Sequence, residues 1–173
     1  MKKLGRKGWT LPELMTVMAI MGILATIAVQ SMKDYLLSIQ LQGATDMIGM
    51  DIRKARIMVF TQGENYRIDF HPKTNSYLLN GEHRMQLPKG ISFGIAPGVT
   101  GKPSDPSEAP PADGITFKGE GMDNRAEFLP KGIVVPTGAV YLTNGKETMA
   151  ITVALNGHTT MWRSKGGKKW LKL

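Results

Sequence analysis

Gly8, Trp9 and Glu13 follow one another near the start of the chain in an order that suits peptide-bond cleavage and charge pairing. Gly8 offers a cleavage site without a side chain, and cleavage after it would make Trp9 the first residue. Glu13 lies at the mouth of an uninterrupted apolar run, residues 14–29, where hydrocarbon makes a carboxylate costly unless it finds a positive partner. The order therefore predicts a processed N-terminus followed by a carboxylate that needs a cation.

The elements that must position these residues are a basic leader and a membrane-length segment. The positive charge of the leader holds the N-terminus in the cytoplasm, and its cations are Lys2, Lys3, Arg6 and Lys7. Residues 14–32 carry no charge, and these 19 residues at about 1.5 Å each span roughly 28 Å, close to the thickness of a bilayer core. We therefore expect residues 1–8 to be a leader and residues 9–35 to be a transmembrane and assembly segment.

The N-terminal segment could also belong to a conventional secretory signal, a plain membrane anchor or a buried helix. A conventional secretory signal has its small-residue cleavage site after the apolar core, and Ala25, Ala28 and Ser31 could provide one. A plain single-pass anchor accounts for the leader and the apolar run but not for Glu13, unless that carboxylate simply lies among the lipid headgroups. A buried helix of a soluble protein would need a larger and less polar remainder than this chain has.

The helix is expected to continue beyond the membrane, over residues 10–61. After residue 33, apolar residues recur at spacings of three and four, which is one stripe of an amphipathic helix. The stripe consists of Leu37, Leu41, Ala44, Ile48, Ile52, Ala55 and Val59. The first half of the helix is thus apolar on every side, and the second half packs one face on a domain.

The remainder of the chain reads as short strands, which gives an α+β fold: a long N-terminal helix packed on an antiparallel β-sheet head, residues 36–173. Asn144-Gly145 and Asn156-Gly157 lie between β-rich runs and predict tight hairpins. Residues 97–114 are rich in proline and glycine without apolar periodicity, so we expect a flexible exposed loop there. The expected strands cover residues 66–70, 76–79, 84–87, 91–95, 115–117, 127–129, 140–142, 149–155 and 159–163.

The positive charge of the chain is concentrated at its two ends. The 173 residues carry a net charge of +8, and removal of the four leader cations would leave +4. The last eleven residues contain five cations: Arg163, Lys165, Lys168, Lys169 and Lys172. Trp170 lies among these cations, and Trp162 directly precedes them. Cations neutralise phosphates and indoles stack on bases or sit at a lipid interface, so this tail could bind DNA. Alternatively, it is a solvated terminus with Trp162 packed at the end of the last strand.

The residue types argue against an enzyme. The chain has no cysteine, which excludes thiolate metal sites and cysteine nucleophiles. His71, His83 and His158 lie in or beside predicted turns without metal-ligand spacing. A calcium loop at Glu120, Asp123 and Asn124 has too weak a spacing, and a solvated turn accounts for these residues better. We therefore expect no catalytic residue, no metal and no cofactor.

The order from Gly8 through Trp9 and Glu13 to the apolar run resembles the class III signal of type IV pilins and of the pseudopilins of type II secretion. Later features are similar to the GspH/FimT group of minor pseudopilins and minor pilins. They are a strand, a proline-containing turn and a second strand after residue 66, the segments 87–91 and 128–132, and a final hairpin near residues 156–158 before a basic terminus. The family often has phenylalanine where this chain has Trp9, and the change keeps a large aromatic residue.

The resemblance implies a processing and assembly pathway. A prepilin peptidase in the bacterial inner membrane would cut between Gly8 and Trp9 and methylate the amine of Trp9. The head would lie in the periplasm, and other pilin or pseudopilin subunits would join the chain in a helical filament. Glu13 would neutralise the N-terminal amine of a neighbouring subunit. The filament would act on secreted cargo or serve a pilus, and FimT-like minor pilins suggest DNA capture by the basic tail as the alternative function.

Overall fold

The protein is described by a computed structural model that covers residues 9–118 and 124–173. The chain divides between Leu36 and Leu37 into two compact units. One helix, α1 (Leu11–Gln62), begins in the first unit and ends in the second. The predicted helix over residues 10–61 is therefore confirmed to within one residue at each end.

In the second unit, α1 is amphipathic as its sequence predicts. Six of the seven stripe residues are buried, and Leu37 is partly buried. Thr45 and Gly49 join the buried face, and the Thr45 hydroxyl donates to the carbonyl oxygen of Leu41 at 2.8 Å. This bond satisfies a hydroxyl that would otherwise be costly inside the core. The helix ends at Gln62 because Gly63 adopts a positive φ of 72°, which glycine tolerates without strain.

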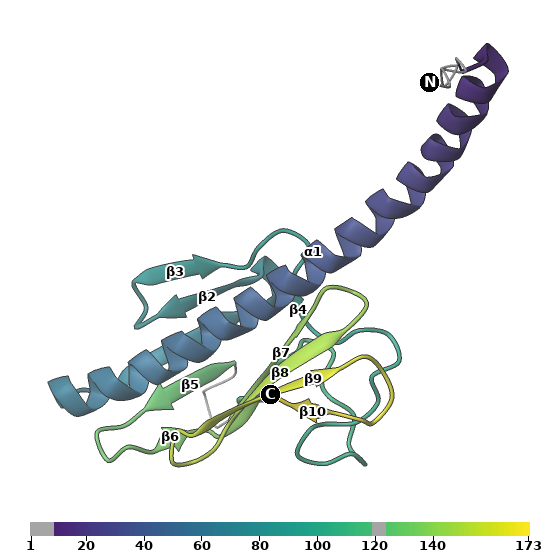
Figure 1. Ribbon diagram of the computed structural model, residues 1–173. Coiled ribbons are helices and arrows are strands. Elements are labelled where there is room, and N and C mark those ends of the chain that lie inside the picture. Colours follow the sequence, from purple (N-terminus) through teal and green to yellow (C-terminus); the bar gives the residue numbers. More distant parts are fainter. Residues whose placement is uncertain (1–8, 119–123) are drawn as a thin grey trace, which may run out of the picture. The chain divides into compact units, whose positions relative to one another are not determined.

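Within the described residues, the strands of the second unit form two five-stranded antiparallel sheets (Figure 1). Sheet A has the order β3-β2-β1-β5-β6, and sheet B has the order β10-β9-β8-β7-β4. The strands of sheet A are β1 (Tyr66–His71), β2 (Ser76–Leu79), β3 (His83–Gln86), β5 (Arg125–Phe128) and β6 (Val134–Val135). Those of sheet B are β4 (Ser92–Phe93), β7 (Gly138–Thr143), β8 (Thr148–Val153), β9 (Thr159–Ser164) and β10 (Leu171–Lys172).

The two predicted Asn-Gly hairpins are confirmed. Asn144-Gly145 joins β7 to β8, and Asn156-Gly157 joins β8 to β9. A third turn, Asn80-Gly81, joins β2 to β3 with positive φ at both residues, 51° and 76°. In the other two turns only the glycine has a positive φ, 85° at Gly145 and 71° at Gly157. Glycine adopts this conformation without strain, and asparagine tolerates it at Asn80, so the turns follow from local chemistry.

Several strand predictions are wrong in extent. Residues 115–117 form no strand; Ile115 makes only an isolated bridge to Val140, although Ile115 and Phe117 are fully buried. The strand expected over residues 91–95 shrinks to Ser92–Phe93, because Gly94 has a φ of 133° that interrupts regular pairing. The sequence analysis missed β6 and β10, whose two-residue lengths carry no alternation to detect.

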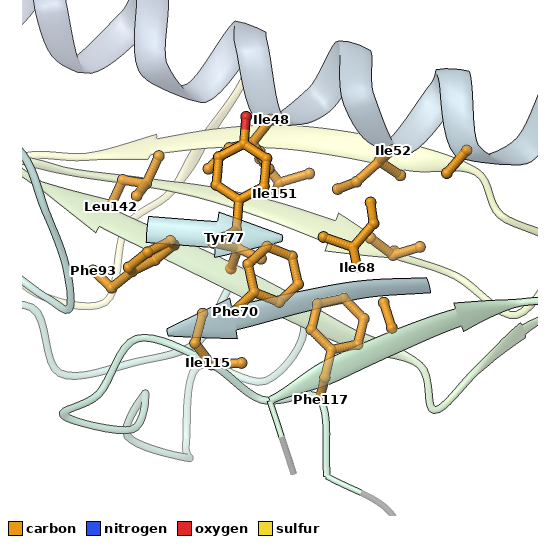
Figure 2. Packing of buried hydrophobic residues seen from close by; sticks show 14 of the residues in the cluster. Ile48, Ile52, Ile68, Phe70, Tyr77, Phe93, Ile115, Phe117, Leu142 and Ile151 are labelled. Carbon is orange, nitrogen blue, oxygen red and sulfur yellow. The ribbon is translucent and has the colours of Figure 1, made fainter. Parts of the chain in front are cut away.

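The core lies between α1 and the two sheets (Figure 2). Ile48 and Ile52 extend from the helix toward Ile68 of sheet A and Ile151 of sheet B, and all four side chains are fully buried. Phe70 stacks on Phe117 with ring centroids 5.7 Å apart. Burial of apolar area at this junction stabilises the head by roughly 25 cal/mol per Å² removed from water. The observed architecture is therefore the expected α+β, pilin-like fold.

A partly buried hydrogen bond joins α1 to sheet A. The Tyr77 hydroxyl donates to Oδ2 of Asp51 at 2.6 Å, and Tyr77 is fully buried. Burial first, and then the hydrogen bond to the Asp51 carboxylate and its negative charge, raise the pKa of Tyr77 well above its ordinary value. The raised pKa keeps the phenol protonated at neutral pH, so it can donate to Asp51.

Candidate functional site

The first candidate site is the start of α1, where Glu13 points back along its own helix. The carbonyl oxygen of Thr10 accepts from the amides of Glu13 and Leu14, both at 3.1 Å, so Thr10 is the N-cap. Oε2 of Glu13 lies 3.5 Å from the Thr10 amide nitrogen and 3.5 Å from its hydroxyl. The carboxylate thus sits over the positive end of the helix dipole, close to Trp9 in the chain.

The carboxylate of Glu13 makes one half of a capping box, a long contact to the Thr10 amide, which the sequence analysis missed. Its signature, Thr10-Leu11-Pro12-Glu13, has the T-x-x-E spacing that precedes many apolar helices. Trp9 is 67% exposed, so its indole contacts little within the unit. Gly8 and the rest of the expected leader lie outside the described residues. The described part of the site therefore comprises an exposed aromatic residue followed by a carboxylate aimed at the N-terminal side.

The segment that follows is suited to a lipid environment. Within the described residues, α1 is the one helix long and apolar enough to cross a membrane, and none of its most apolar stretch is buried. Thr16, Thr26 and Ser31 donate their hydroxyl protons to carbonyl oxygens of the same helix at 2.9, 2.6 and 3.3 Å. Hydrocarbon offers these hydroxyls no partner, so bonds inside the helix lower the cost of burying them in lipid.

The second candidate site, the basic tail, is more ordered than the sequence suggests. Leu171 and Lys172 form β10 and pair with Arg163 and Trp162 of β9. The tail is therefore not simply a solvated terminus after the last strand. Four of its cations point into solvent, and they are Lys165, Lys168, Lys169 and Lys172.

The tail also anchors the proline-rich loop, residues 97–114. The amides of Thr100 and Gly167 donate to the carbonyl oxygens of Gly167 and Gly98 at 3.0 and 2.6 Å. Trp170 Nε1 donates to the carbonyl oxygen of Gly101 at 2.7 Å. The loop contains no helix or strand, yet Val99 is only 5% exposed. Local sequence could not reveal this ordering, since the partners lie about seventy residues away along the chain.

Both tryptophans near the basic tail are engaged in packing. Trp162 Nε1 donates to the Thr152 hydroxyl at 3.1 Å, and Trp162 is half-buried. Trp170 meets Tyr141 edge to face, with ring centroids 5.9 Å apart. Burial, together with the charge of Glu108, raises the pKa of Tyr141 to about 12. The indoles therefore build the outer cluster of sheet B, and stacking on a base would compete with these contacts.

Arg163 differs from the four exposed lysines because it is already paired. Its guanidinium contacts Oε2 of Glu147 at 2.7 Å and donates to the Ser38 hydroxyl at 3.0 Å. Burial alone would raise the pKa of Glu147, but hydrogen bonds from Ser38 and Arg163, with the charges of Arg163 and Lys165, lower it below its ordinary value. Arg163 therefore joins β9 to α1, and a phosphate would have to displace a carboxylate to reach it.

Comparison with known proteins identifies the N-terminal segment. Residues 3–29 match the family model of the prokaryotic N-terminal methylation motif. The motif indicates a type IV pilin-like or pseudopilin subunit. No curated protein and no solved structure matches the chain.

The methylation motif bears on processing, assembly and membrane anchoring. Proteins with this motif are processed by a prepilin peptidase and assemble with other pilins. Such subunits are generally structural, not enzymatic. The motif and the apolar helix together indicate anchoring in a membrane by a single helix.

The remaining polar candidates are scattered over the head. His71 ends β1, His83 begins β3, and His158 lies in the turn before β9. Within residues 9–118 and 124–173, no group of three histidine, aspartate or glutamate side chains could hold a metal ion. Of the proposed calcium loop, Asn124 is described, whereas Glu120 and Asp123 lie outside the described residues.

Proposed function

We propose that this chain is a minor pseudopilin or minor pilin of the GspH/FimT type, processed between Gly8 and Trp9 and methylated on Trp9. The head lies in the periplasm, and the apolar half of α1 is held in the bacterial inner membrane until the chain enters a filament. The observation that carries the proposal is the position of Glu13, alone among uncharged residues at the start of a methylation-motif helix.

Glu13 supplies the assembly chemistry in this proposal. A carboxylate near lipid costs a few kcal/mol, and the capping bonds at 3.5 Å recover little of that. Cleavage after Gly8 frees an amine on each subunit, and a neighbouring amine offers Glu13 the cation that its own helix lacks. Pairing is possible only when two subunits align along their axes, so it sets axial register during assembly.

The proposal assigns the chain a mechanical function. In a type II secretion system, the filament pushes or plugs folded cargo; in a type IV pilus, the subunit primes assembly or adheres. An assembly assay tests the proposal in either setting. The tagged full-length chain, expressed with its own peptidase and filament proteins, is expected in the sheared filament fraction. Recovery only from the soluble fraction would contradict the proposal.

A second candidate function is DNA binding by the basic tail. It is favoured by Lys168, Lys169 and Lys172, which are exposed and make no ion pair within the described part of the chain. Such lysines can neutralise phosphates and release counterions, which makes affinity fall steeply with salt. The paired Arg163 and the packed indoles contribute less than the sequence suggested.

The double substitution Lys168→Ala and Lys169→Ala is expected to weaken DNA binding by the full-length chain in detergent. Loss of two phosphate contacts reduces the slope of log affinity against log salt by about 2. A filter-binding titration across salt concentrations measures the slope. The matched control is Lys89→Ala with Lys131→Ala, which removes two exposed lysines elsewhere. Equal losses in the two double variants, or no salt-dependent affinity in the wild type, would remove the DNA function.

A further inference from the structure

The face of sheet B that points away from the core carries a hollow of about 420 Å³. Its floor includes a row across three strands, because Ala139 of β7, Thr152 of β8 and Thr160 of β9 lie side by side in the sheet register. One wall is formed by Lys102, Ser104 and Glu108 of the proline-rich loop. Sites for small molecules in proteins are concave and of this size.

The wall is held in place by bonds within the loop and to the C-terminal tail. Figure 1 shows this loop, in teal, beside sheet B. The amide of Lys102 donates to the carbonyl oxygens of Asp105 and Glu108 at 3.1 and 2.9 Å, which closes the segment into a compact turn. Nζ of Lys102 lies 2.5 Å from Oε1 of Glu108, and the indole of Trp170 binds the preceding residue, Gly101. A wall that is already ordered lowers the entropic cost of binding.

Tyr141 lines the hollow and carries a hydroxyl without a partner. The side chain is 1% exposed, yet its hydroxyl makes no hydrogen bond to the described residues and is not sealed from solvent. A buried tyrosine hydroxyl usually finds a partner, because an unpaired one is costly. Burial and the charge of Glu108 raise the pKa of Tyr141 to about 12, so the phenol keeps its proton at neutral pH. The fold therefore holds a hydrogen-bond donor ready for a bound molecule.

Several other lining groups are hydroxyls, which can both donate and accept. Thr116 and Thr152 use theirs within the fold, since they accept from the Ala139 amide and the Trp162 indole. The hydroxyls of Ser104, Thr137 and Thr160 make no hydrogen bond within residues 9–118 and 124–173. An apolar ligand would leave these groups unpaired, at a cost. The hollow is therefore suited to a ligand that is itself rich in hydroxyls.

The charges of the hollow favour a neutral ligand. Among its described lining residues, Lys102 and Glu108 neutralise each other. An anion would compete with Glu108 for the amine, and a cation would compete with Lys102 for the carboxylate. A neutral hydroxyl can accept from the amine or donate to the carboxylate while the pair stays intact.

We propose that this hollow binds a neutral saccharide, whose hydroxyls accept from Tyr141 and exchange hydrogen bonds with Thr137 and Thr160. The inference is independent of filament assembly, because it needs only the folded head.

Saturation-transfer NMR on the full-length chain tests the ligand class, in a detergent whose headgroup is not a sugar. The neutral probes are glucose, galactose, mannose and N-acetylglucosamine. We expect transfer to at least one of them, and about fivefold weaker binding of the uronate and the amine of the same sugar, since each would disturb the pair of Lys102 and Glu108. N-acetylglucosamine linked to a glycine–serine peptide, compared with the bare peptide, distinguishes a protein-borne glycan from a free sugar.

Two outcomes of this experiment would overturn the ligand class. One is the absence of transfer to every neutral sugar, free or peptide-linked, including the case in which the bare peptide binds instead. The other is tighter binding of a charged counterpart than of the neutral sugar.

The substitution Tyr141→Phe tests the site itself. It removes the hydroxyl and keeps the ring that packs on Trp170, so sugar affinity is expected to fall about fivefold to tenfold. The melting temperature is expected to stay the same or rise, because the hydroxyl has no partner in the fold to lose. Thr160→Val is the second variant and is expected to weaken binding by a similar factor. The matched controls are Tyr66→Phe and Thr159→Val, which do not line the hollow.

Wild-type affinity in Tyr141→Phe, or an equal loss in Tyr66→Phe, would overturn the assignment of the site. If Tyr141→Phe lowers the melting temperature, the comparison of Thr160→Val with Thr159→Val decides in the same way. Incorporation of Tyr141→Phe into filaments is expected to be unchanged, so a failure of the saccharide site and a failure of the proposed function are distinguishable.

Discussion

Replacing Glu13 with alanine is expected to leave the chain in the membrane and to remove it from the filament. Insertion becomes easier, since a costly carboxylate is lost from the edge of the apolar segment. Assembly loses the only acidic group in residues 9–33 that could meet a neighbour's amine. Removing one partner from a buried ion pair costs about 3–5 kcal/mol, so the filament-bound fraction should fall roughly a hundredfold or more.

The two roles of Glu13 can be separated with matched variants. Thr10→Ala removes a hydroxyl that only approaches the Glu13 carboxylate at 3.5 Å and keeps that carboxylate, so it should change helix stability by less than about 1 kcal/mol and leave assembly largely intact. Glu13→Gln keeps the shape without the charge and should assemble as poorly as Glu13→Ala. Membrane fractionation and shearing measure the two properties. Normal incorporation of Glu13→Ala, or an equal defect in Thr10→Ala, would show that charge pairing does not drive assembly.

The second large effect is expected in the core, where Ile48→Ala should destabilise the head by about 2–5 kcal/mol. Ile48 is fully buried and contacts both sheets through the central cluster, so truncation leaves a cavity beneath α1 (Figure 2). Alanine favours a helix slightly more than isoleucine does, so the loss cannot come from helix propensity.

Ile57→Ala is the matched control for this prediction. It removes the same atoms from the same helix at a position that is 61% exposed, so stability should change by no more than about 0.5 kcal/mol. Urea unfolding of the full-length chain in detergent, followed by circular dichroism, measures both variants. Similar changes at the two positions would contradict the assignment of Ile48 to the core and Ile57 to the exposed face of α1.

The parts of the molecule predicted correctly from sequence are those governed by local chemistry. The helical stripe from Leu41 to Val59 needs only regular spacing, and the Asn-Gly hairpins need only residues that tolerate positive φ. The assembly role of Glu13 rests on the same kind of local chemistry, because a charge beside an apolar run is costly wherever the chain folds, and it stays a prediction. The T-x-x-E spacing of Thr10 and Glu13 was detectable by the same local reasoning.

The parts that sequence reasoning missed depend on contacts between distant segments. Arg163 looked like a free cation because Ser38, one of its partners, is 125 residues away. Trp170 looked available for stacking on a base. Its indole N–H in fact donates a hydrogen bond to the carbonyl oxygen of Gly101, which lies in a segment without apolar periodicity. Burial of Ile115 and Phe117 without strand pairing likewise reflects packing of the finished head, which alternation along the chain cannot encode.

We propose that the mature chain begins at Trp9. Intact-mass and N-terminal peptide measurements on protein from cells that contain the prepilin peptidase test it most directly. We expect a polypeptide without residues 1–8 that carries one methyl group on the amine of Trp9. A polypeptide that retains Met1, or one that starts well inside the apolar segment, would contradict it.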